Sequence, residues 1–465
     1  MPATSTYKRP ACTISDSLEL LKQEIQIQFE GTMHHISFEW QEEKLHAAFV
    51  EAQRKIVEEL LSQYDINLPA ISFDGKEYRQ AVRCENTYLS SVGPVRVERS
   101  LYRTKGQNET ICPMDLRTGM IEEKWTPRAA KQALFVVSSL TPYDGEKLFK
   151  ELGAMQPSRS SLDRLPKKLN TRWEEKREVF EESLRAQSEV PDEAVAIGVS
   201  LDGVLIPMQG GKVLPGDSRY EEASCGSVTF YDGEGEALAT RRYGRMPERK
   251  KMTLKSFLTK EVEYALKCNP RLQLVKVADG ARDNWAFLEE ELPDGLSVLD
   301  FYHAVEHLKK AFEMAYGVDS QNTTAEFFKY RTILRHDLRG IDKVIRKLGA
   351  LVKKNPRKKL LQTELNYFKS NKHRCRYEEF SALYLPIGSG IVEATCKTLV
   401  SQRLKLSGMC WQTKGGQAIL TFRAFLQSQL FDDAWEKLSA EYKSEITPPE
   451  NIISFRNEAR KVVSG

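Results

Sequence analysis

The sequence lacks the patterns that would mark it as a membrane, secreted or disulfide-stapled protein. No stretch approaches 18 consecutive apolar residues, so no membrane span is expected. The first residues contain no apolar core of the secretory type, which leads us to expect a cytoplasmic protein. The eight cysteines form no CxxC pair, so reduced thiols are expected. Neither internal repeats nor low-complexity tracts occur, and the 465 residues indicate about two to four globular domains.

A large excess of one charge is also absent, because 69 Lys and Arg oppose 65 Asp and Glu and leave a net charge of +4. The distribution is uneven. Residues 331–380 hold 15 basic and 5 acidic residues, a local charge of +10, so the rest of the chain carries 4 minus 10, or −6. Such a block suits a polyanion, since each neutralised phosphate releases counterions. A solvated helical face is the alternative interpretation.

Residues 1–190 are expected to form a mainly helical N-terminal region that binds DNA. An amphipathic helix is predicted over residues 42–64 because apolar residues recur there at helical spacing. These apolar residues are Leu45, Phe49, Ile56 and Leu60. Two alternating runs in residues 86–103, joined around Gly93 and Pro94, predict a β-hairpin.

Three short helices are expected after Thr126. The second ends at Gly153 and the third begins after Ser158, which is the spacing of a helix-turn-helix. The exposed Arg159 and Arg164 of the third helix are therefore candidate DNA contacts, although any small helical bundle has a similar pattern.

Two boundaries are expected at the end of this region. Pro166 should stop the third helix early, because proline lacks the amide hydrogen and clashes with the preceding turn. Residues 171–187 then predict a separate charged helix, followed by a linker over residues 189–193.

From Ala194 onwards the sequence predicts a mixed α/β domain in the order βββαβαβ. Strand-like runs followed by alternating helices and strands favour a mixed sheet covered by helices. We expect the first part of this core over residues 191–316, a basic helical insertion over 317–385, returning core helices over 386–435 and a tail over 436–465. A long helix is predicted to end at Gly408.

Three acids stand in unusual positions within this frame. Asp202 interrupts an apolar strand, Asp279 closes a strand before a glycine, and Glu393 follows a GSG turn at the start of a helix. A charge within a sheet is costly unless it is paired or bound to a metal. Two Mg²⁺ ions held by such carboxylates can stabilise the attacking and leaving oxygens of a phosphoryl transfer. Individually, each acid could instead form a turn or favour a helix start.

Several longer motifs support the metal interpretation. The chain contains SLDGVLIPM, YGRMPERKKMTLKSFL, VKVADGARDNW, VLDFYHAVEHL, YLPIGSGIVEATCKTLVSQRLKLSGMCW and GGQAILTFRA. Over about residues 195–435 it resembles the ISKra-type insertion-sequence transposases, members of the Asp-Asp-Glu class with a ribonuclease H-like core. The resemblance implies that Asp202, Asp279 and Glu393 together bind two divalent metal ions, either Mg²⁺ or Mn²⁺.

The resemblance also implies an insertion and partners. The 393 minus 279, or 114, positions between the last two acids exceed what the core requires, which fits an all-α insertion domain. The basic block would then lie on DNA. The cations expected to contact DNA there are Lys353, Lys354, Arg357, Lys358 and Lys359. The implied partners are terminal inverted repeats and target DNA, bound by a nucleoid-associated homo-oligomer.

The segment DFYHAVEH contains Asp300, His303 and His307. Asp300 and His303 resemble the C/D(2)H signature of Mutator- and hAT-like transposases, which implies a supporting catalytic role for His303. A histidine satisfied within the core is the alternative. His303 and His307 share a helix face but lack the glutamate of an HExxH zinc site. Relatives are expected to carry paired cysteines after the hairpin, where this chain keeps only Cys112, so a zinc finger is not expected.

Further cations follow Glu393 along the chain. Lys397, Arg403 and Lys405 are candidates for phosphate contacts, with a polar outer helix face as the alternative. Trp411 could stack on a flipped base or simply pack.

The predicted function is therefore a DNA transposase that cuts and joins element ends. A ribonuclease H-like nuclease or resolvase would share the same acids, and a transposase-derived DNA-binding regulator would lack catalysis. A glycosidase using two of these acids would need neither a metal nor a basic domain.

Overall fold

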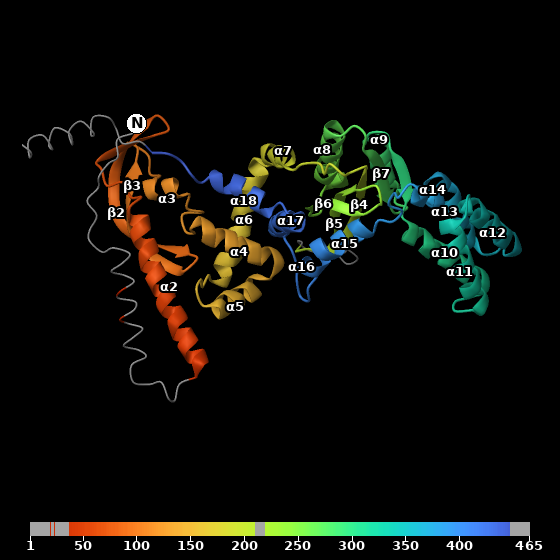
Figure 1. Ribbon diagram of the computed structural model, residues 1–465, viewed down its shortest axis with the longest axis horizontal. Coiled ribbons are helices and arrows are strands. Elements are labelled where there is room, and N and C mark those ends of the chain that lie inside the picture. The colour runs from red at the N-terminus through yellow and green to blue at the C-terminus, as the bar shows by residue number, and fades with distance from the viewer. Residues whose placement is uncertain (1–18, 20–22, 24–36, 210–218, 447–465) are drawn as a thin grey trace, which may run out of the picture. The chain divides into compact units, whose positions relative to one another are not determined.

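The computed structural model describes residues 19, 23, 37–209 and 219–446 (Figure 1). The chain divides into two compact units, one formed by Met1–Leu169 with Trp435–Gly465 and the other by Asn170–Ala434. The division into five parts expected from the sequence stays a prediction. The end of its tail, residues 447–465, and the start of its N-terminal region lie outside the described residues.

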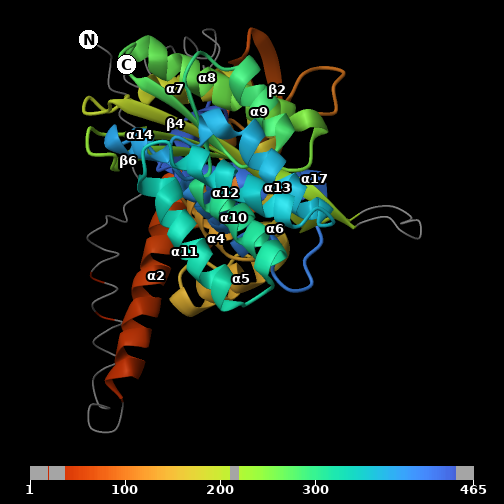
Figure 2. The same ribbon diagram turned by 90° about the vertical axis from the view of Figure 1, so that its right-hand side faces the viewer.

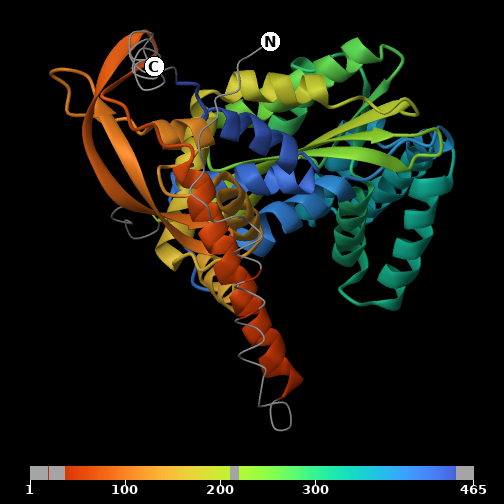
Figure 3. The same cartoon turned by 60° about the vertical axis from the view of Figure 1, so that its left-hand side comes forward.

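The first unit contains a three-stranded antiparallel sheet with the order β1-β2-β3 (Figure 3). Its strands are β1 (Ala70–Phe73), β2 (Lys76–Ser90) and β3 (Gly93–Arg103). The predicted hairpin is confirmed, with Ser90 paired to Gly93 at its turn. Gly93 has a φ of 103°, a conformation that favours glycine, which explains the glycine at this position.

The long helix α2 (Phe38–Ser62) packs against β3. The helix was predicted, but the face it buries was not. Leu45, Phe49 and Leu60 are 39%, 44% and 50% exposed, whereas Val50 and Leu61 are buried. The sequence pattern thus located the helix and misidentified its packed side.

Four helices follow β3 in the first unit, and the last of them extends beyond the boundary of this unit at Leu169. They are α3 (Pro113–Thr118), α4 (Pro127–Ser139), α5 (Pro142–Leu152) and α6 (Arg159–Glu175). Thr126 precedes Pro127 at the start of α4, Ser158 accepts the N–H of Ser161 at the start of α6, and Gly153 ends α5 at a φ of 79°. These helix limits agree with the sequence.

Pro166 does not end its helix. It lies inside α6, which continues to Glu175, so the predicted helix over residues 171–187 is divided between α6 and α7 (Arg177–Gln187). The side chains of Leu162, Leu165, Leu169 and Trp173 are buried along α6. This continuous apolar face offsets the cost of the proline, which is why the local rule failed.

The second unit contains a five-stranded mixed sheet with the order β6-β5-β4-β7-β8. Its strands are β4 (Ala196–Pro207), β5 (Tyr220–Tyr231), β6 (Ala237–Arg245), β7 (Gln273–Ala278) and β8 (Leu296–Leu299). The pairs β4–β5 and β5–β6 are antiparallel, whereas β4–β7 and β7–β8 are parallel. The predicted order βββαβαβ and the mixed sheet are confirmed.

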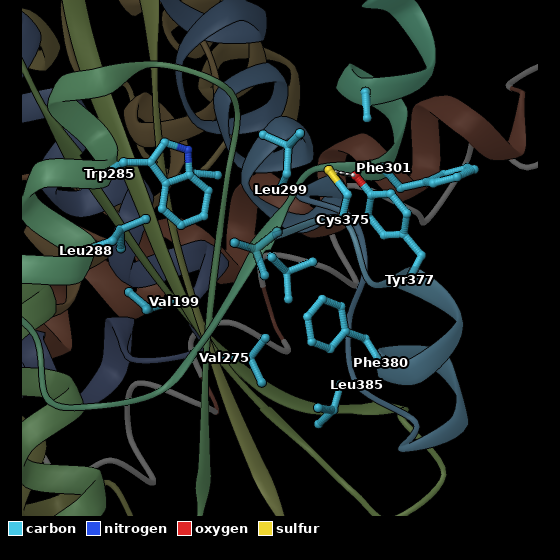
Figure 4. Packing of buried hydrophobic residues seen from close by; sticks show 14 of the residues in the cluster. Val199, Val275, Trp285, Leu288, Leu299, Phe301, Cys375, Tyr377, Phe380 and Leu385 are labelled. Carbon is cyan, nitrogen blue, oxygen red and sulfur yellow. Dashed lines mark hydrogen bonds between the residues drawn. The ribbon is translucent and has the colours of Figure 1, made fainter. Parts of the chain in front are cut away.

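Helices cover this sheet. Between β6 and β7 lies α8 (Met252–Cys268), preceded by a short 3₁₀ turn, and between β7 and β8 lies α9 (Arg282–Glu290). A large apolar cluster includes Val199 of β4, Leu258 of α8 and Phe287 of α9. Figure 4 shows part of it, with Trp285 near Leu288 and with Phe380 near Leu385. This packing fixes the strand ends that carry the acids.

The segment after β8 is helical, as predicted. It contains α10 (Phe301–Tyr316), α11 (Gln321–His336), α12 (Gly340–Lys354), α13 (Lys359–Ser370) and α14 (Tyr377–Ala382). Figure 2 shows α10 to α13 packed side by side, in agreement with their contacts. Both ends of the segment meet at the sheet, because the N–H of Phe301 donates to the carbonyl of Ile387 at 3.0 Å.

The last helices return to the sheet. Helix α15 (Gly390–Thr395) packs on β4 and β5 and continues as a π-helical turn over Cys396–Ser401 and as α16 (Gln402–Leu404). The helix predicted up to Gly408 therefore ends earlier. Helix α17 (Thr413–Gln427) packs on β6, and α18 (Phe431–Ala440) follows. One-turn π segments are frequent at functional sites.

Candidate active site

Asp202 and Asp279 lie at the same level of two neighbouring strands. In the parallel pair β4–β7, Ser200 is in register with Val277, two residues before each aspartate. Continuing this register brings Asp202 beside Asp279, although 77 positions, 279 minus 202, separate them in the sequence. Strand pairing, which the sequence did not specify, thus brings these two predicted residues together.

Asp202 is partly buried and surrounded by a thiol and an amide. One carboxylate oxygen accepts the N–H of Gly203 at 2.7 Å, and the other accepts the S–H of Cys396 at 3.7 Å. Burial raises the pKa of the Asp202 carboxyl, and the charge of Asp279 raises it further. The N–H of Gly203 and the charge of Lys251 act in the opposite direction. Two like charges so placed favour a bound cation.

Asp279 uses only one of its carboxylate oxygens within the described part of the chain. Oδ1 accepts the N–H of Ala281 at 3.1 Å and the amide of Asn284 at 3.2 Å. Asp279 therefore does stabilise the turn that follows β7, as the alternative interpretation of this residue expects. Because Oδ2 has no hydrogen bond to a described residue, the same side chain can also bind a metal, and the two interpretations are compatible.

Glu393 lies on α15, which packs against β4 and β5. It is exposed, and its side chain makes no ion pair with any described residue. Cys396, three residues later and so on the neighbouring turn, touches Asp202. The structure thus brings the helix of Glu393 to the aspartates and leaves Glu393 itself exposed, without a contact to either of them.

Asp300 anchors the start of that helix. It is 3% exposed and accepts the N–H of His303 at 2.6 Å. Ser389 donates both its N–H and its hydroxyl to the other oxygen of Asp300. Since Ser389 directly precedes α15, Asp300 fixes the beginning of the helix that carries Glu393.

The two histidines have different surroundings. His303 is exposed, whereas His307 is paired through Nδ1 with Glu364 of α13 at 2.6 Å. His307 also stacks on Tyr367 with ring centroids 3.7 Å apart. An ideal Cβ at Gly280 would lie 2.5 Å from the Tyr367 ring, so α13 contacts the turn that follows Asp279. The segment between β8 and α15 therefore helps to shape the site.

Sequence reasoning missed Lys251, Glu222 and Asn284. Lys251 pairs with Glu222 at 2.6 Å and donates to the side chain of Asn284, which in turn bonds Asp279. No spacing rule points to these residues. One local signal for Glu222 is the glycine at position 203. A Cβ there would lie 2.2 Å from the Glu222 carboxylate and would clash with it.

The candidate DNA contacts of the first unit are exposed. The Arg159 guanidinium lies over the ring of Tyr143, 5.8 Å from its centroid, and Arg164 donates to the carbonyl of Ser160. Arg164 also borders a cavity of about 130 Å³ with Lys124 and Lys168. The charged groups of this lining are mainly basic, which suits an anion.

The basic block is concentrated around the α12–α13 connection. Four of its cations are exposed and make no ion pair within the described chain. They are Lys353, Lys354, Arg357 and Lys359. Lys358 differs, because its ammonium donates to the carbonyls of Met314 and Ala315 at 2.6 and 3.2 Å. It therefore completes the C-terminal end of α10.

The cations after Glu393 divide in the same way. Lys397 and Lys405 are exposed, but Arg403 is 1% exposed and lies over the Trp411 ring at 5.5 Å. The Trp411 indole donates to the carbonyl of Leu404 at 2.8 Å. Trp411 packs against α16 and against Arg403 within it, so a phosphate or a base does not reach Arg403 in this arrangement.

The described part of the chain, Asp202, Asp279 and Glu393 included, shows neither a preformed metal-ligand cluster nor a membrane-spanning helix. Over residues 19, 23, 37–209 and 219–446, no three His, Cys, Asp or Glu side chains are grouped closely enough to hold a metal ion. Cys112 is buried, and burial raises the pKa of its thiol to about 12. None of the helices described is long and apolar enough to cross a membrane.

Comparison with known proteins gives a distant likeness. No family model matches the chain, and neither does any curated protein. Among solved structures, the Drosophila P element transposase strand transfer complex is similar at 10% sequence identity, with a TM-score of 0.35. The match covers 68% of this chain and 95% of the other. At this TM-score the likeness is too low to support an inference.

Proposed function

We propose that this chain is a DNA transposase of the Asp-Asp-Glu class with a ribonuclease H-like core. The observation that carries the proposal is the placement of Asp202 and Asp279 side by side on the central parallel strands of the β6-β5-β4-β7-β8 sheet. A helix bearing Glu393 packs on the same sheet. The ISKra-type motifs lie on these elements, since SLDG is in β4, VKVAD ends β7 and GSGIVEA begins α15.

The donor set fits a hard divalent cation. Asp202 and Asp279 offer carboxylate oxygens, which Mg²⁺ and Mn²⁺ prefer, and a bound cation would relieve the mutual repulsion of the two charges. Glu393 completes the set by turning its exposed side chain towards the aspartates. When bound by Asp202, Asp279 and Glu393, such ions would supply Lewis-acid activation of the attacking hydroxyl, of water or of a DNA 3′ end, and stabilisation of the leaving oxygen.

The protein side chains orient this chemistry. Gly203 and Ala281 donate N–H groups that fix the two aspartates, and Asp300 fixes the start of α15 through Ser389. The exposed cations of α12 and α13, with Arg159 and Arg164 of α6, are proposed to bind the phosphates of element ends and target DNA. A homo-oligomer that holds two ends together is part of the same proposal.

The test is Mg²⁺- or Mn²⁺-dependent cleavage of DNA that carries the flanking element ends. Asp202→Asn, Asp279→Asn and Glu393→Gln are compared with Asp283→Asn, an exposed acid on α9. Each of the three site variants is expected to lose at least about 1000-fold in rate, because metal stabilisation is worth several kcal/mol and about 1.36 kcal/mol is tenfold. DNA affinity and the Asp283→Asn rate should stay unchanged.

Two outcomes would redirect the proposal. Cleavage that survives Asp202→Asn and Asp279→Asn would refute the metal site. Cleavage without joining of a 3′ end to target DNA would favour a nuclease or resolvase with the same core.

A further inference from the structure

Lys251 carries a positive charge into the candidate active site. Its ammonium pairs with Glu222 at 2.6 Å and donates to Asn284 at 3.4 Å, and Asn284 bonds Asp279. Its charge also acts on Asp202, whose pKa it lowers. The side chain of Lys251 is 23% exposed, so it is partly enclosed yet accessible from the site.

The backbone around Lys251 is unusual. Lys250 and Lys251 both adopt left-handed conformations, with φ of 54° and 55°, immediately before α8 begins at Met252. Such conformations are unfavourable for non-glycine residues and persist where surrounding structure imposes them, often at functional sites. Gly203 contributes to the same arrangement, because any Cβ there would strike the Glu222 carboxylate that pairs with Lys251.

The Glu222 pair is easily exchanged. The Glu222 side chain is 48% exposed, and an ion pair with one partner so open to solvent contributes little stability. A DNA phosphate brought to Asp202 and Asp279 would offer the ammonium a stronger, charge-assisted hydrogen bond. The two aspartates repel such a phosphate, so a cation close to them, in addition to any bound metal, would favour phosphate binding.

We propose that Lys251 is a catalytic residue whose ammonium binds a non-bridging oxygen of the scissile phosphate held at Asp202 and Asp279. This inference rests on the proposed phosphoryl transfer. No bond to Lys251 forms or breaks, since it stabilises charge on the phosphate oxygens as the attacking oxygen arrives.

Lys250 supplies a matched control, because it has the same charge and backbone conformation but is exposed and makes no ion pair within the described chain. Lys251→Gln should lower the maximal rate at saturating DNA by about 100-fold, as loss of one preorganised donor does. Lys250→Gln should leave it within about twofold. Lys251→Gly should lower the maximal rate and Lys250→Gly should not, although both substitutions relieve the backbone strain. This result would attribute the lost rate to the missing charge of Lys251.

A second readout does not require activity. Removing a cation beside Asp202 should tighten Mn²⁺ binding measured by calorimetry in Lys251→Gln, and not in Lys250→Gln. Rates for Lys251→Gln equal to those of Lys250→Gln, or a loss explained by a lower melting temperature, would overturn the inference. Should the wild type bind Mn²⁺ but cut no DNA, the proposed function fails; unchanged Mn²⁺ affinity in Lys251→Gln would then overturn the placement of Lys251 as well.

Discussion

Charged side chains are exposed to solvent at the α12–α13 connection, whereas some of those on the helices next to the sheet of the second unit are buried. Lys353, Lys354 and Arg357 are exposed at the connection without ion pairs in the described chain, whereas Arg403 of α16 and Glu181 of α7 are buried. A charge count along the sequence treats these residues alike. The comparison teaches that composition locates a basic segment, while only packing decides which cations are free to meet a polyanion.

Arg403 provides the largest expected effect in this comparison. Arg403→Ala removes a fully buried side chain, and we expect the free energy of unfolding to fall by about 4 kcal/mol, in the range for large core truncations. Lys405→Ala, two residues away and exposed, should change it by less than about 0.5 kcal/mol. Chemical denaturation measures both. Equal stability of the two variants would mean that Arg403 is not a packing residue.

The buried Glu181 of α7 is expected to make the stability of the fold depend on pH. Burial raises its pKa from 4.5 to about 7, the charges of Glu261 and Glu174 act in the same direction, and Arg185 and Arg177 oppose them. The folded state therefore binds the proton more tightly, and its stability falls as pH rises from about 4.5 to about 7. Glu181→Gln should remove this fall, making the variant more stable than wild type at pH 8 by up to about 3 kcal/mol.

Denaturation midpoints of wild type and Glu181→Gln at about pH 4.5 and about pH 8, on either side of this window, measure the effect. A constant difference between the two proteins across that range would show that Glu181 stays ionised within the fold.

Substitution of the exposed cations at the α12–α13 connection should have the smallest effect per residue. It should weaken DNA binding and leave the free energy of unfolding unchanged. Alanine at Lys353, Lys354, Arg357 and Lys359 together should flatten the slope of log affinity against log salt by about 0.9 for each DNA phosphate that is no longer neutralised. Lys358→Ala should leave the slope unaltered, because its ammonium binds the carbonyls that end α10. Fluorescence anisotropy over a salt series distinguishes them. If Lys358→Ala changed the slope more than the alanine substitutions of its neighbours, Lys358 and not its neighbours would be the DNA contact.

Much of the second unit could be predicted from sequence because its elements are strongly patterned. The order βββαβαβ followed from apolar runs bounded by glycines, and Asp202 and Asp279 stood out as charges at strand positions. Pro166 was misjudged because packing along α6 outweighs a local rule, and the apolar stripe of α2 was misjudged because periodicity does not say which side packs.

The candidate site was only half predictable for a related reason. Lys251 and Glu222 come together through strand pairing and an unusual backbone turn, neither of which has a spacing signature. Glu393 lies in the first turn of a helix that packs on the sheet, as its sequence context indicates, but the sequence does not specify which way its side chain turns. Its role as a metal ligand, like that of the two aspartates, stays a prediction.

The hydrogen bonds between Asp300 and Ser389 join residues that are 89 positions apart. Everything between them leaves the sheet and returns to the same point. Insertions or deletions in the parts of the segment away from Tyr367, which contacts the turn after Asp279, can therefore accumulate during evolution without displacing the three acids, since doubling the length of a closed loop costs only about 0.6 kcal/mol. The spacing between Asp279 and Glu393 should be expected to drift among homologues, while the Asp300–Ser389 pair should persist as the fixed boundary of the variable segment.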